Sequence, residues 1–443
     1  MGMIQTFTQA WRIPEMRKKL LFTLLVLLLF RLGSNIPVPG VNKLLLTSMF
    51  DANQAGILGL FDMFSGGSFS NFTIFALGVS PYITSSIVVQ LLTVAIPALE
   101  ELAKQGEEGR RKINRITRYI AIGLAFIQAI GYTFGLFRNV LTDDYATVFG
   151  KIVIVLVLVA GSCVLMWMGE KINDKGIGNG VSLIIFAGIV SRIPTVITNT
   201  FASLKAGGWA FIGSTSEGGT KTVGILSVIL FIVFALIVIV GIILVTEGTR
   251  KIPVQYAKRV VGRKMYGGQS THIPMKVNQA GVMPVIFAVS ILQLPATIAY
   301  MVPNSGFARF VAKYLSSQGN PGFWIYFILD IIFIIGFTYF YGAISVNPVE
   351  IADNMKNNGG FIPGIRPGKP TVEFITKVMN RLTIVSAIFL AIVASLPTLL
   401  QHWTALSIGF GGTSLIIAVG VALDTSRALE TQLVMRNYSG FLK

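Results

Sequence analysis

Long apolar runs, separated by shorter polar segments, occupy most of the chain. A helix needs roughly 20 apolar residues to cross the hydrocarbon layer of a membrane, and ten runs approach that length. They lie at residues 19–38, 76–97, 118–138, 151–169, 180–199, 223–245, 282–302, 323–346, 382–400 and 405–425. Membrane-spanning β-strands alternate apolar and polar residues, whereas the run at 227–245 is apolar on every side. The pattern predicts an all-α membrane protein with ten transmembrane helices.

One segment, FSGGSFSNFTIFALGVSPYITSSIVVQ (64–90), departs from this pattern. It starts with small polar residues, meets Gly78 and Pro81, and becomes continuously apolar only afterwards. Half a span and irregular backbone persist at membrane depth only where protein or a water-filled cavity shields their polar groups. The break therefore predicts a cavity. The alternative is an amphipathic helix lying on the membrane surface.

The composition agrees with a membrane protein. Of 443 residues, 53% are hydrophobic and 12% are charged, against roughly a quarter charged in soluble domains. The first run follows Arg17, Lys18 and Lys19, as a secretory signal would. We interpret it as an anchor, because no small-residue cleavage site follows it and nine further runs do. Cys163 is the single cysteine, so no intramolecular disulfide is expected.

Basic residues predict the orientation, because cytoplasmic loops carry an excess of Lys and Arg. With both termini in the cytoplasm, 27 of the 36 basic residues fall on the cytoplasmic side. The net charge of +17 then lies mostly on one face, where anionic lipids, ribosomal RNA or an acidic protein could bind. Orientation by positive charge explains part of this excess without any partner.

Two of the cytoplasmic loops, residues 247–281 and 347–381, are long and strongly basic. In the first, IPVQYAKRV (252–260) is expected to extend as a strand before GRKMYGG turns the chain back. The second is expected to form a short amphipathic helix followed by a tip rich in Gly and Pro. Loops of this length are usually functional or disordered, and their mixed apolar and basic content favours a docking surface.

The sequence lacks the patterns of common enzymes. A phosphate-binding loop requires GxxxxGK followed by Ser or Thr, and neither GGFIPGI (359–365) nor GIRPGKP (364–370) fits. His272 and His402 stand far apart without clustered cysteines or carboxylates, so no metal site is expected. KGIGNG (175–180) has no preceding strand and is better explained as a tight turn. We predict no enzyme activity, no cofactor and no bound metal.

A secondary transporter of a small solute is the main alternative, because such proteins also contain helices broken by Gly and Pro. They usually carry ionisable residues inside their spans. Here Arg31 and Asp330 are the main examples, and a snorkelling arginine and a hydrogen-bonded aspartate explain them. Branched apolar residues beside Gly, Pro, Ser or Thr also recur in the spans. Each by itself is typical of a core or lipid-facing position.

Six motifs, in order along the whole chain, resemble the SecY family, which forms the centre of the bacterial Sec protein-conducting channel. The motifs are FSGG...IFALGVSPYITSSIVVQLL, KQGEEGRRKINRITRY, LMWMGEKINDKGIGNGVSLIIFAGIV, QSTHIPMKVNQAGVMPVIFA, ADNMKNNGGFIPGIRPGKPT and GGTSLIIAVGVALD. The resemblance implies a channel in the bacterial cell membrane that passes unfolded secretory polypeptides and releases signal sequences and transmembrane segments laterally into lipid. It also implies partners: SecE, SecG, the motor ATPase SecA, the ribosome and precursors with signal peptides.

The resemblance further implies two pseudo-symmetric halves of five helices, residues 1–222 and 223–443, around an hourglass pore. A re-entrant plug is expected at about 56–77. Its expected central residues are Phe64, Ser65, Gly66, Gly67, Ser68 and Phe69. The expected constriction ring of the pore consists of Val79, Ile83, Ile185, Ile286 and Ile417. A narrow apolar collar dewets and blocks ions. Val79 is smaller than the Ile often present there in the family, which leaves more of the sealing to the plug.

Two further sites are implied by the resemblance. A lateral gate is expected where the second and third spans meet the seventh and eighth, with Pro81, Ser85, Gln90, Ile127, Pro284 and Gln293. We hypothesise that the amides of Gln90 and Gln293 help to hold this gate shut. The motor and the ribosome are expected to bind Tyr256, Lys258, Arg259, Arg263, Lys264, Arg366 and Lys369 on the two basic loops. Arginine suits this role because its planar fork binds carboxylates, carbonyls and phosphates.

Overall fold

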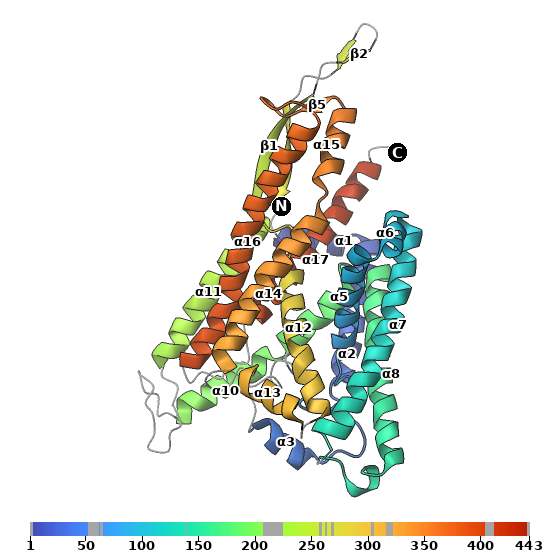
Figure 1. Cartoon of the computed structure of the whole chain (residues 1–443), viewed down its shortest axis with the longest axis vertical. Helices are drawn as coiled ribbons and strands as arrows, with labels where there is room; N and C mark the ends of the chain where they lie inside the picture. Colours follow the sequence, from blue (N-terminus) through green and yellow to red (C-terminus); the bar gives the residue numbers. More distant parts are fainter. Residues whose placement is uncertain are drawn as a thin grey trace.

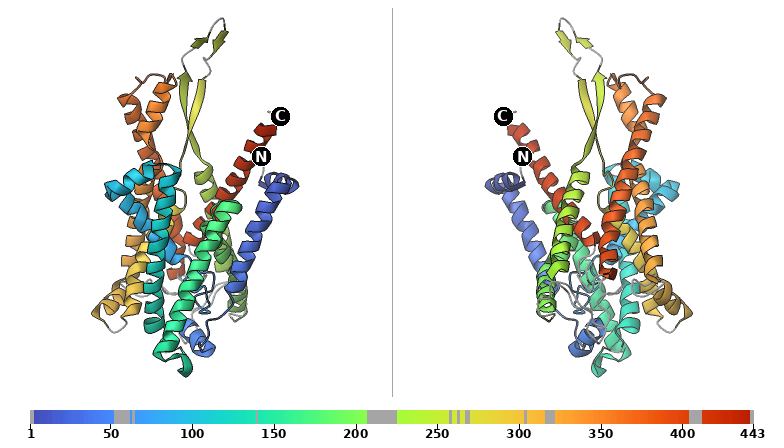
Figure 2. Two further views of the ribbon diagram at one scale, coloured as in Figure 1. Left: turned by 90° about the vertical axis from the view of Figure 1, so that its right-hand side faces the viewer. Right: turned by 90° about the vertical axis from the view of Figure 1, so that its left-hand side faces the viewer.

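The computed structural model describes residues 3–51, 62, 65–138, 140–206, 225–256, 259–261, 264–266, 270–302, 305–315, 322–403 and 412–440. Its helices form an elongated bundle from which a strand ribbon projects at one end (Figure 1, Figure 2). We name this end the ribbon end. The opposite end, where α3 (Lys43–Asp51) and α13 (Gly306–Tyr314) lie, is named the α3 end.

The bundle is built from long helices with short helices at its ends. The long helices are α2 (Pro14–Gly33), α5 (Ser80–Ala95), α7 (Glu107–Gly131), α8 (Val148–Lys175), α9 (Gly180–Ser191) with α10 (Ile193–Ala206), α11 (Ile225–Glu247), α12 (Met283–Met301), α14 (Gly322–Ser345), α16 (Lys369–Trp403) and α17 (Gly412–Gly440). The short ones are α1 (Met3–Arg12), α6 (Pro97–Lys104), α15 (Pro348–Asn357), η1 (Tyr132–Leu136) and η2 (Asp143–Tyr145).

The described residues of each of the ten predicted apolar runs fall mainly on one helix or on two consecutive helices, which agrees with the predicted all-α class. In the described part of the chain, seven helices are long and apolar enough to cross a membrane. An eighth span is obtained if α5 and α6 count as one. These two helices meet at 101°, because Ile96 before Pro97 is extended and cannot continue the helix.

Several predicted helix boundaries were wrong. The first helix ends at Gly33 rather than residue 38, because the chain turns to pair Pro37 with Thr73. The run at 180–199 is divided at Arg192 into α9 and α10. The run at 382–400 belongs to α16, which already starts at Lys369. The early turns of α16 pack outside the bundle against the ribbon and α15, so their polar composition concealed the start of the helix.

The first basic loop forms the ribbon, as predicted for its apolar half. β1 (Thr249–Tyr256) pairs antiparallel with β4 (Ser270–Lys276), and the shorter β2 (Arg259–Val261) and β3 (Lys264–Tyr266) pair farther out. β5 (Gly360–Phe361), from the second basic loop, adds to the other edge of β1. The predicted amphipathic helix of that loop is α15, which begins where the Asn347 side chain accepts a hydrogen bond from the Val349 amide at 3.1 Å.

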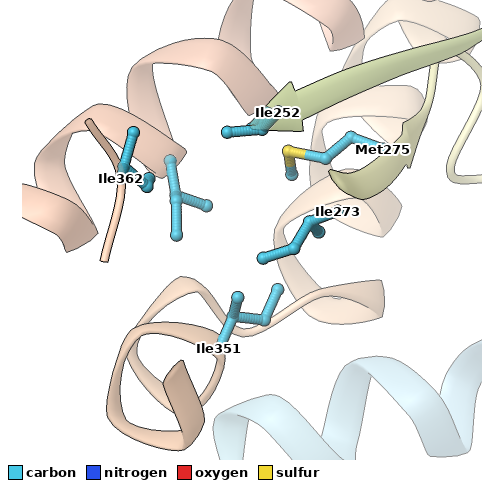
Figure 3. Close-up of a pocket in the computed structure, with 6 residues that line it drawn as sticks. Ile252, Ile273, Met275, Ile351 and Ile362 are labelled. Carbon is cyan, nitrogen blue, oxygen red and sulfur yellow. The ribbon is translucent and has the colours of Figure 1, made fainter. Parts of the chain in front are cut away.

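A small apolar core joins the two basic loops. Ile252, Ile273 and Met275 of the ribbon face Ile351 and Ile362 of the second loop (Figure 3). The space between them encloses about 10 Å³, which is no more than one water molecule needs. We therefore interpret this contact as packing that makes the two loops one structural unit, rather than as a ligand pocket.

Candidate functional site

The segment between α3 and α5 folds back into the bundle as a series of turns. From Ser65 to Gly78 it contains no regular helix, and Gly66 and Gly67 adopt φ values of 66° and 88°, which favour glycine. Backbone hydrogen bonds from the Val38 amide to the Phe72 carbonyl (2.9 Å) and from the Ile74 amide to the Ile36 carbonyl (3.1 Å) pair it with residues 36–38. The segment thus lies in the bundle as irregular backbone rather than as a membrane-spanning helix.

Aromatic side chains anchor this segment in a core of its own. Phe69 and Phe72 are 1% and 0% exposed and pack on Phe137, with ring centroids 5.5 Å and 4.2 Å apart. Tyr132 packs on Phe69 at 5.3 Å. The other members come from α7, α8, residues 38–46, residues 140–141 and the segment itself. The segment is therefore held by the first half of the chain.

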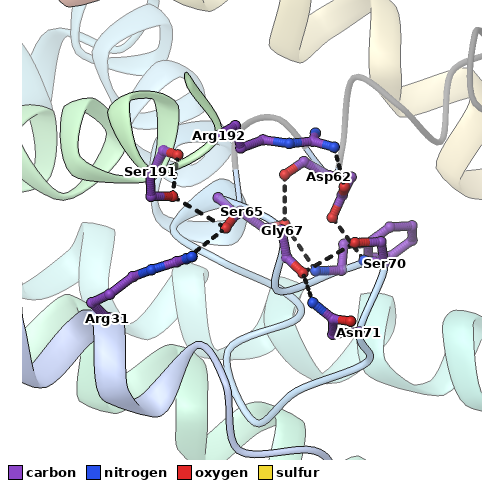
Figure 4. A network of polar contacts seen from close by, with 11 residues as sticks. Arg31, Asp62, Ser65, Gly67, Ser70, Asn71, Ser191 and Arg192 are labelled. Carbon is purple, nitrogen blue, oxygen red and sulfur yellow. Dashed lines mark hydrogen bonds and ion pairs between the residues drawn. The ribbon is translucent and has the colours of Figure 1, made fainter. Parts of the chain in front are cut away.

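A polar network fastens the same segment to α2 and to the α9–α10 junction (Figure 4). Arg192 forms an ion pair with Asp62 at 2.9 Å, and the Asp62 carboxylate also accepts the Ser70 amide at 2.7 Å. The Asp62 side chain is only 3% exposed. Arg31 donates to the Gly66 carbonyl at 3.1 Å, and the Ser191 hydroxyl approaches the same oxygen at 3.5 Å. Two basic side chains thus hold the turn from one side.

Gly66 also makes a close backbone contact with α9. A Cβ atom at this position would lie 2.6 Å from the Cα atom of Gly188 on α9. At Gly67 an added Cβ would meet nothing within 4 Å. The two glycines therefore differ: both need a left-handed backbone, but only Gly66 needs the missing side chain for packing.

The predicted ring residues converge in one apolar cluster. Val79, Ile83, Ile185, Ile286 and Ile417 are all buried, with exposures of 4%, 8%, 2%, 3% and 0%, and all five belong to the same cluster of packed side chains. They come from α5 or its N-cap, α9, α12 and α17. Neither spacing nor periodicity relates these positions, so the tertiary structure alone brings them together.

Glycines and prolines set the starting points of the helices that carry these residues. Gly78 (φ 58°) and Gly281 (φ 63°) lie just before α5 and α12, and a proline occupies the first turn of each helix. Proline is favoured there because the first helical amides lack partners within the helix. Val79 and Ile286 therefore lie close to helix N-termini, next to irregular backbone.

The predicted gate lies where α12 packs against α5 and α7. The Tyr341 hydroxyl of α14 donates a hydrogen bond to the Gln90 side-chain oxygen of α5. The same Gln90 amide donates to the Ser86 hydroxyl at 3.3 Å. Phe287 of α12 packs edge-on against Tyr341, with centroids 4.9 Å apart. Gln90 thus joins α5 to α14, on opposite sides of the predicted gate.

The other predicted gate residues occupy different environments. Pro81, Ser85, Pro284 and Gln293 are buried, and the Ser85 hydroxyl donates to its own helix at the Tyr82 carbonyl. Within the described residues, the Gln293 side-chain nitrogen has no hydrogen-bond partner. Ile127 is 52% exposed on the outer face of α7. Only Gln90 of this set therefore forms a polar contact between the halves in the described structure.

The predicted docking residues that the structure describes lie at the ribbon end. Tyr256 lies at the end of β1 opposite Gly360, where an added Cβ would come within 2.9 Å of the tyrosine ring. Arg366 and Lys369 are exposed on the tip between β5 and α16, and the Thr371 hydroxyl donates to the Arg366 carbonyl at 2.9 Å. Arg259 and Lys264 lie on β2 and β3. Lys258 and Arg263, and Phe64 of the expected plug, lie outside the described residues.

Some residues of this arrangement were not recognised in the sequence. Asp62 was not singled out, although it is the one carboxylate between residues 52 and 99, and a lone charge in such a segment was a usable signal. Arg192 carried no sequence signal beyond its charge, and Arg31 was explained by snorkelling rather than by its bond to Gly66. Tyr341 carried no signal, because aromatic residues are frequent throughout the spans.

A bundle of long apolar helices that encloses an inserted turn segment defines the class of polytopic membrane proteins. The SecY family model matches residues 73–426. The chain belongs to the SecY family, which confirms the resemblance seen in the six motifs.

Curated relatives support this assignment. The chain is 45% identical over 464 residues to "Protein translocase subunit SecY" of Mycobacterium tuberculosis and 44% identical over 446 residues to that of Bacillus subtilis. Each alignment covers 100% of both chains.

Solved structures share the fold. "The structure of a protein conducting channel" aligns with a TM-score of 0.65 at 19% identity, covering 94% of this chain and 93% of the other. "Sec61 in the Canine ribosome-channel complex from the endoplasmic reticulum" aligns with a TM-score of 0.60 at 17% identity, with the same coverage of both chains.

Proposed function

We propose that this chain is a protein-conducting channel that passes unfolded polypeptides across a membrane and releases apolar segments sideways into lipid. The relatives named as protein translocase subunits support this function, and family membership favours a channel over an enzyme or a small-solute transporter. The observation that carries the mechanism is the convergence of five branched apolar side chains from both halves in one buried cluster.

The ring provides a seal that does not select among peptides. Apolar side chains at a constriction exclude water and therefore ions. They make no specific hydrogen bond, so no particular polypeptide sequence is retained. Val79, Ile83, Ile185, Ile286 and Ile417 act as this collar, and their burial corresponds to a closed state.

The segment from about residue 56 to 77 is the plug that reinforces the seal. Its packing on α7 and α8 and its polar contacts to Arg31 and Arg192 all lie within the first half of the chain. Separation of the two halves therefore does not by itself break these contacts. Gate opening and plug release are two distinct steps in this mechanism.

The lateral gate opens between α5 and α7 on one side and α12 and α14 on the other. A signal sequence that enters this seam must replace the hydrogen bond between Gln90 and Tyr341. The hypothesis that the Gln90 and Gln293 amides hold the gate shut is tested by replacing both residues with Leu. Export of precursors with weak signal sequences is expected to rise, and unchanged export would assign both amides to contacts within their own halves.

The ribbon end is the cytoplasmic docking surface for the motor ATPase SecA and for the ribosome. The two basic loops form one unit through β1, β5 and their shared apolar core, and Arg366 is exposed at its tip. Solved structures of the same fold include channels bound to ribosomes, by their titles. The chain then lies in a bacterial cell membrane, with both of its termini in the cytoplasm.

Residues 1–222 and 223–443 act as two halves, with SecE and SecG as further subunits and anionic lipids around the basic cytoplasmic face. Precursors with signal peptides are the substrates. The packing of α12, from the second half, against α5 and α7, from the first half, supports this division. The exposed apolar face of α11 leaves room for a partner helix or lipid.

Crosslinking tests the proposed path directly. In a Cys163→Ser background, a single cysteine is introduced at Ile83 or Ile286, and a stalled secretory precursor carrying one cysteine is added. Crosslinks are expected at both ring positions and not at Leu236, which is 57% exposed on α11. Absence of ring crosslinks, combined with uptake of a small solute by vesicles containing this chain alone, would favour a transporter.

A further inference from the structure

The short helix α13 lies across the ends of α12 and α14 at the α3 end of the bundle (Figure 1, Figure 2). It begins where the Ser305 hydroxyl accepts the Ala308 amide at 3.0 Å. Val311, 2% exposed, packs on Ala296 and Ala299 of α12. The helix is thus attached to the bundle by one narrow apolar face, which leaves two other faces to account for.

The first of these faces is aromatic and exposed. Phe307 and Phe310 are 46% and 53% exposed, and the Phe310 ring packs on Tyr314 with centroids 5.1 Å apart. Residues three, four and seven apart share one side of a helix, so these three rings form a single surface. Trp324 of α14, 44% exposed, adds an indole near the same end. Tyr and Trp, here Tyr314 and Trp324, concentrate at the boundary between hydrocarbon and headgroups.

The second face is cationic. Arg309 and Lys313 are four residues apart and both exposed, and the Lys313 ammonium lies 5.2 Å from the Tyr314 ring centroid. No Asp or Glu occurs between residues 300 and 329. In the described part of the chain, neither cation has an ion-pair partner, whereas Arg31 and Arg192 at the same end are engaged by the turn segment.

We infer that α13 is a binding site for an anionic phospholipid in the external leaflet. The aromatic face enters the acyl boundary, as in amphipathic helices that lie in the membrane interface. Arg309 and Lys313 then reach the headgroup phosphate, where arginine binds two oxygens at once. Because α13 packs on α12, bound lipid holds the end of that helix at the interface. This last consequence depends on the proposed gate, whereas lipid binding itself does not.

Photocrosslinking at Phe310 tests the site. The full chain, with p-benzoylphenylalanine replacing Phe310, is placed in nanodiscs containing equal amounts of phosphatidylglycerol and phosphatidylcholine, and the crosslinked lipid is identified by mass spectrometry. The same probe at Leu236, in the uncharged middle of α11, reports the lipid ratio of the bulk bilayer. We expect phosphatidylglycerol to be enriched at Phe310 relative to Leu236.

Charge variants then identify the cause of this enrichment. Arg309→Gln and Lys313→Gln are each expected to reduce it about fivefold, the effect of one basic residue near anionic headgroups. Lys43→Gln, an equal charge change on α3, is expected to leave it unchanged. The bulk lipid ratio at Phe310, an unchanged enrichment in both α13 variants, or crosslinks to protein in place of lipid would each overturn the proposal.

Discussion

The ion pair between Arg192 and Asp62 gives the sharpest test of the plug. Asp62→Asn keeps an oxygen that can accept the Ser70 amide but removes the charge that faces Arg192 at 2.9 Å. Removing one partner of a buried pair costs about 3–5 kcal/mol. The Arg192 side chain is 27% exposed, so water partly compensates it, and we expect a smaller cost of about 2–3 kcal/mol.

This cost applies to the docked plug and therefore changes the ratio of docked to released plug. Since 1.4 kcal/mol corresponds to a factor of ten, the ratio should fall by about 30-fold to 150-fold. Ion conductance of the resting channel in planar bilayers measures the change. We expect a higher resting conductance for Asp62→Asn, and no change for Asp143→Asn, which alters an exposed carboxylate on η2.

A double-mutant cycle separates the ion pair from a general loss of structure. If the two charges act on each other, adding Arg192→Gln to Asp62→Asn should change the logarithm of the conductance by less than the sum of the two single changes. Strict additivity would show that the residues act independently. A resting conductance equal to that of the wild-type chain in Asp62→Asn would refute the assignment of this pair to plug docking.

Three further predictions concern the other contacts. Tyr341→Phe removes one hydrogen bond worth about 0.5–1.5 kcal/mol, so export of precursors with weakened signal sequences should rise by up to about tenfold, and unchanged export would exclude a role in the gate. Gly66→Ala should raise the resting conductance more than Gly67→Ala, because only the first creates a backbone clash at 2.6 Å; equal effects would contradict this packing argument. Arg366→Glu should abolish motor-driven export while membrane assembly remains intact, with Lys356→Glu on α15 as the control, and normal export by the Arg366 variant would refute the docking assignment.

Local features of the chain were well predicted from sequence. Helices at the ten apolar runs, the strand at residues 252–256, the helix α15 and the irregular segment before α5 all follow from hydrophobic length, Gly and Pro positions and turn chemistry. These signals are local, because a helix in lipid satisfies its backbone within its own segment. The predicted start of α16 was less accurate, because this helix begins at Lys369 with polar residues that precede its apolar run.

Only the tertiary structure decided which side chains of different helices contact one another. No local signal indicated that Asp62 would meet Arg192, that Gln90 would meet Tyr341, or which faces of the spans would be buried. In a soluble protein apolar residues mark the core, but in lipid the outer surface is apolar too. Accordingly, only 12% of the very apolar span Val228–Glu247 is buried, against 56% of the more polar span Gly412–Met435. The sequence determined which segments enter the membrane, whereas packing among equally apolar surfaces decided which side chains line the centre.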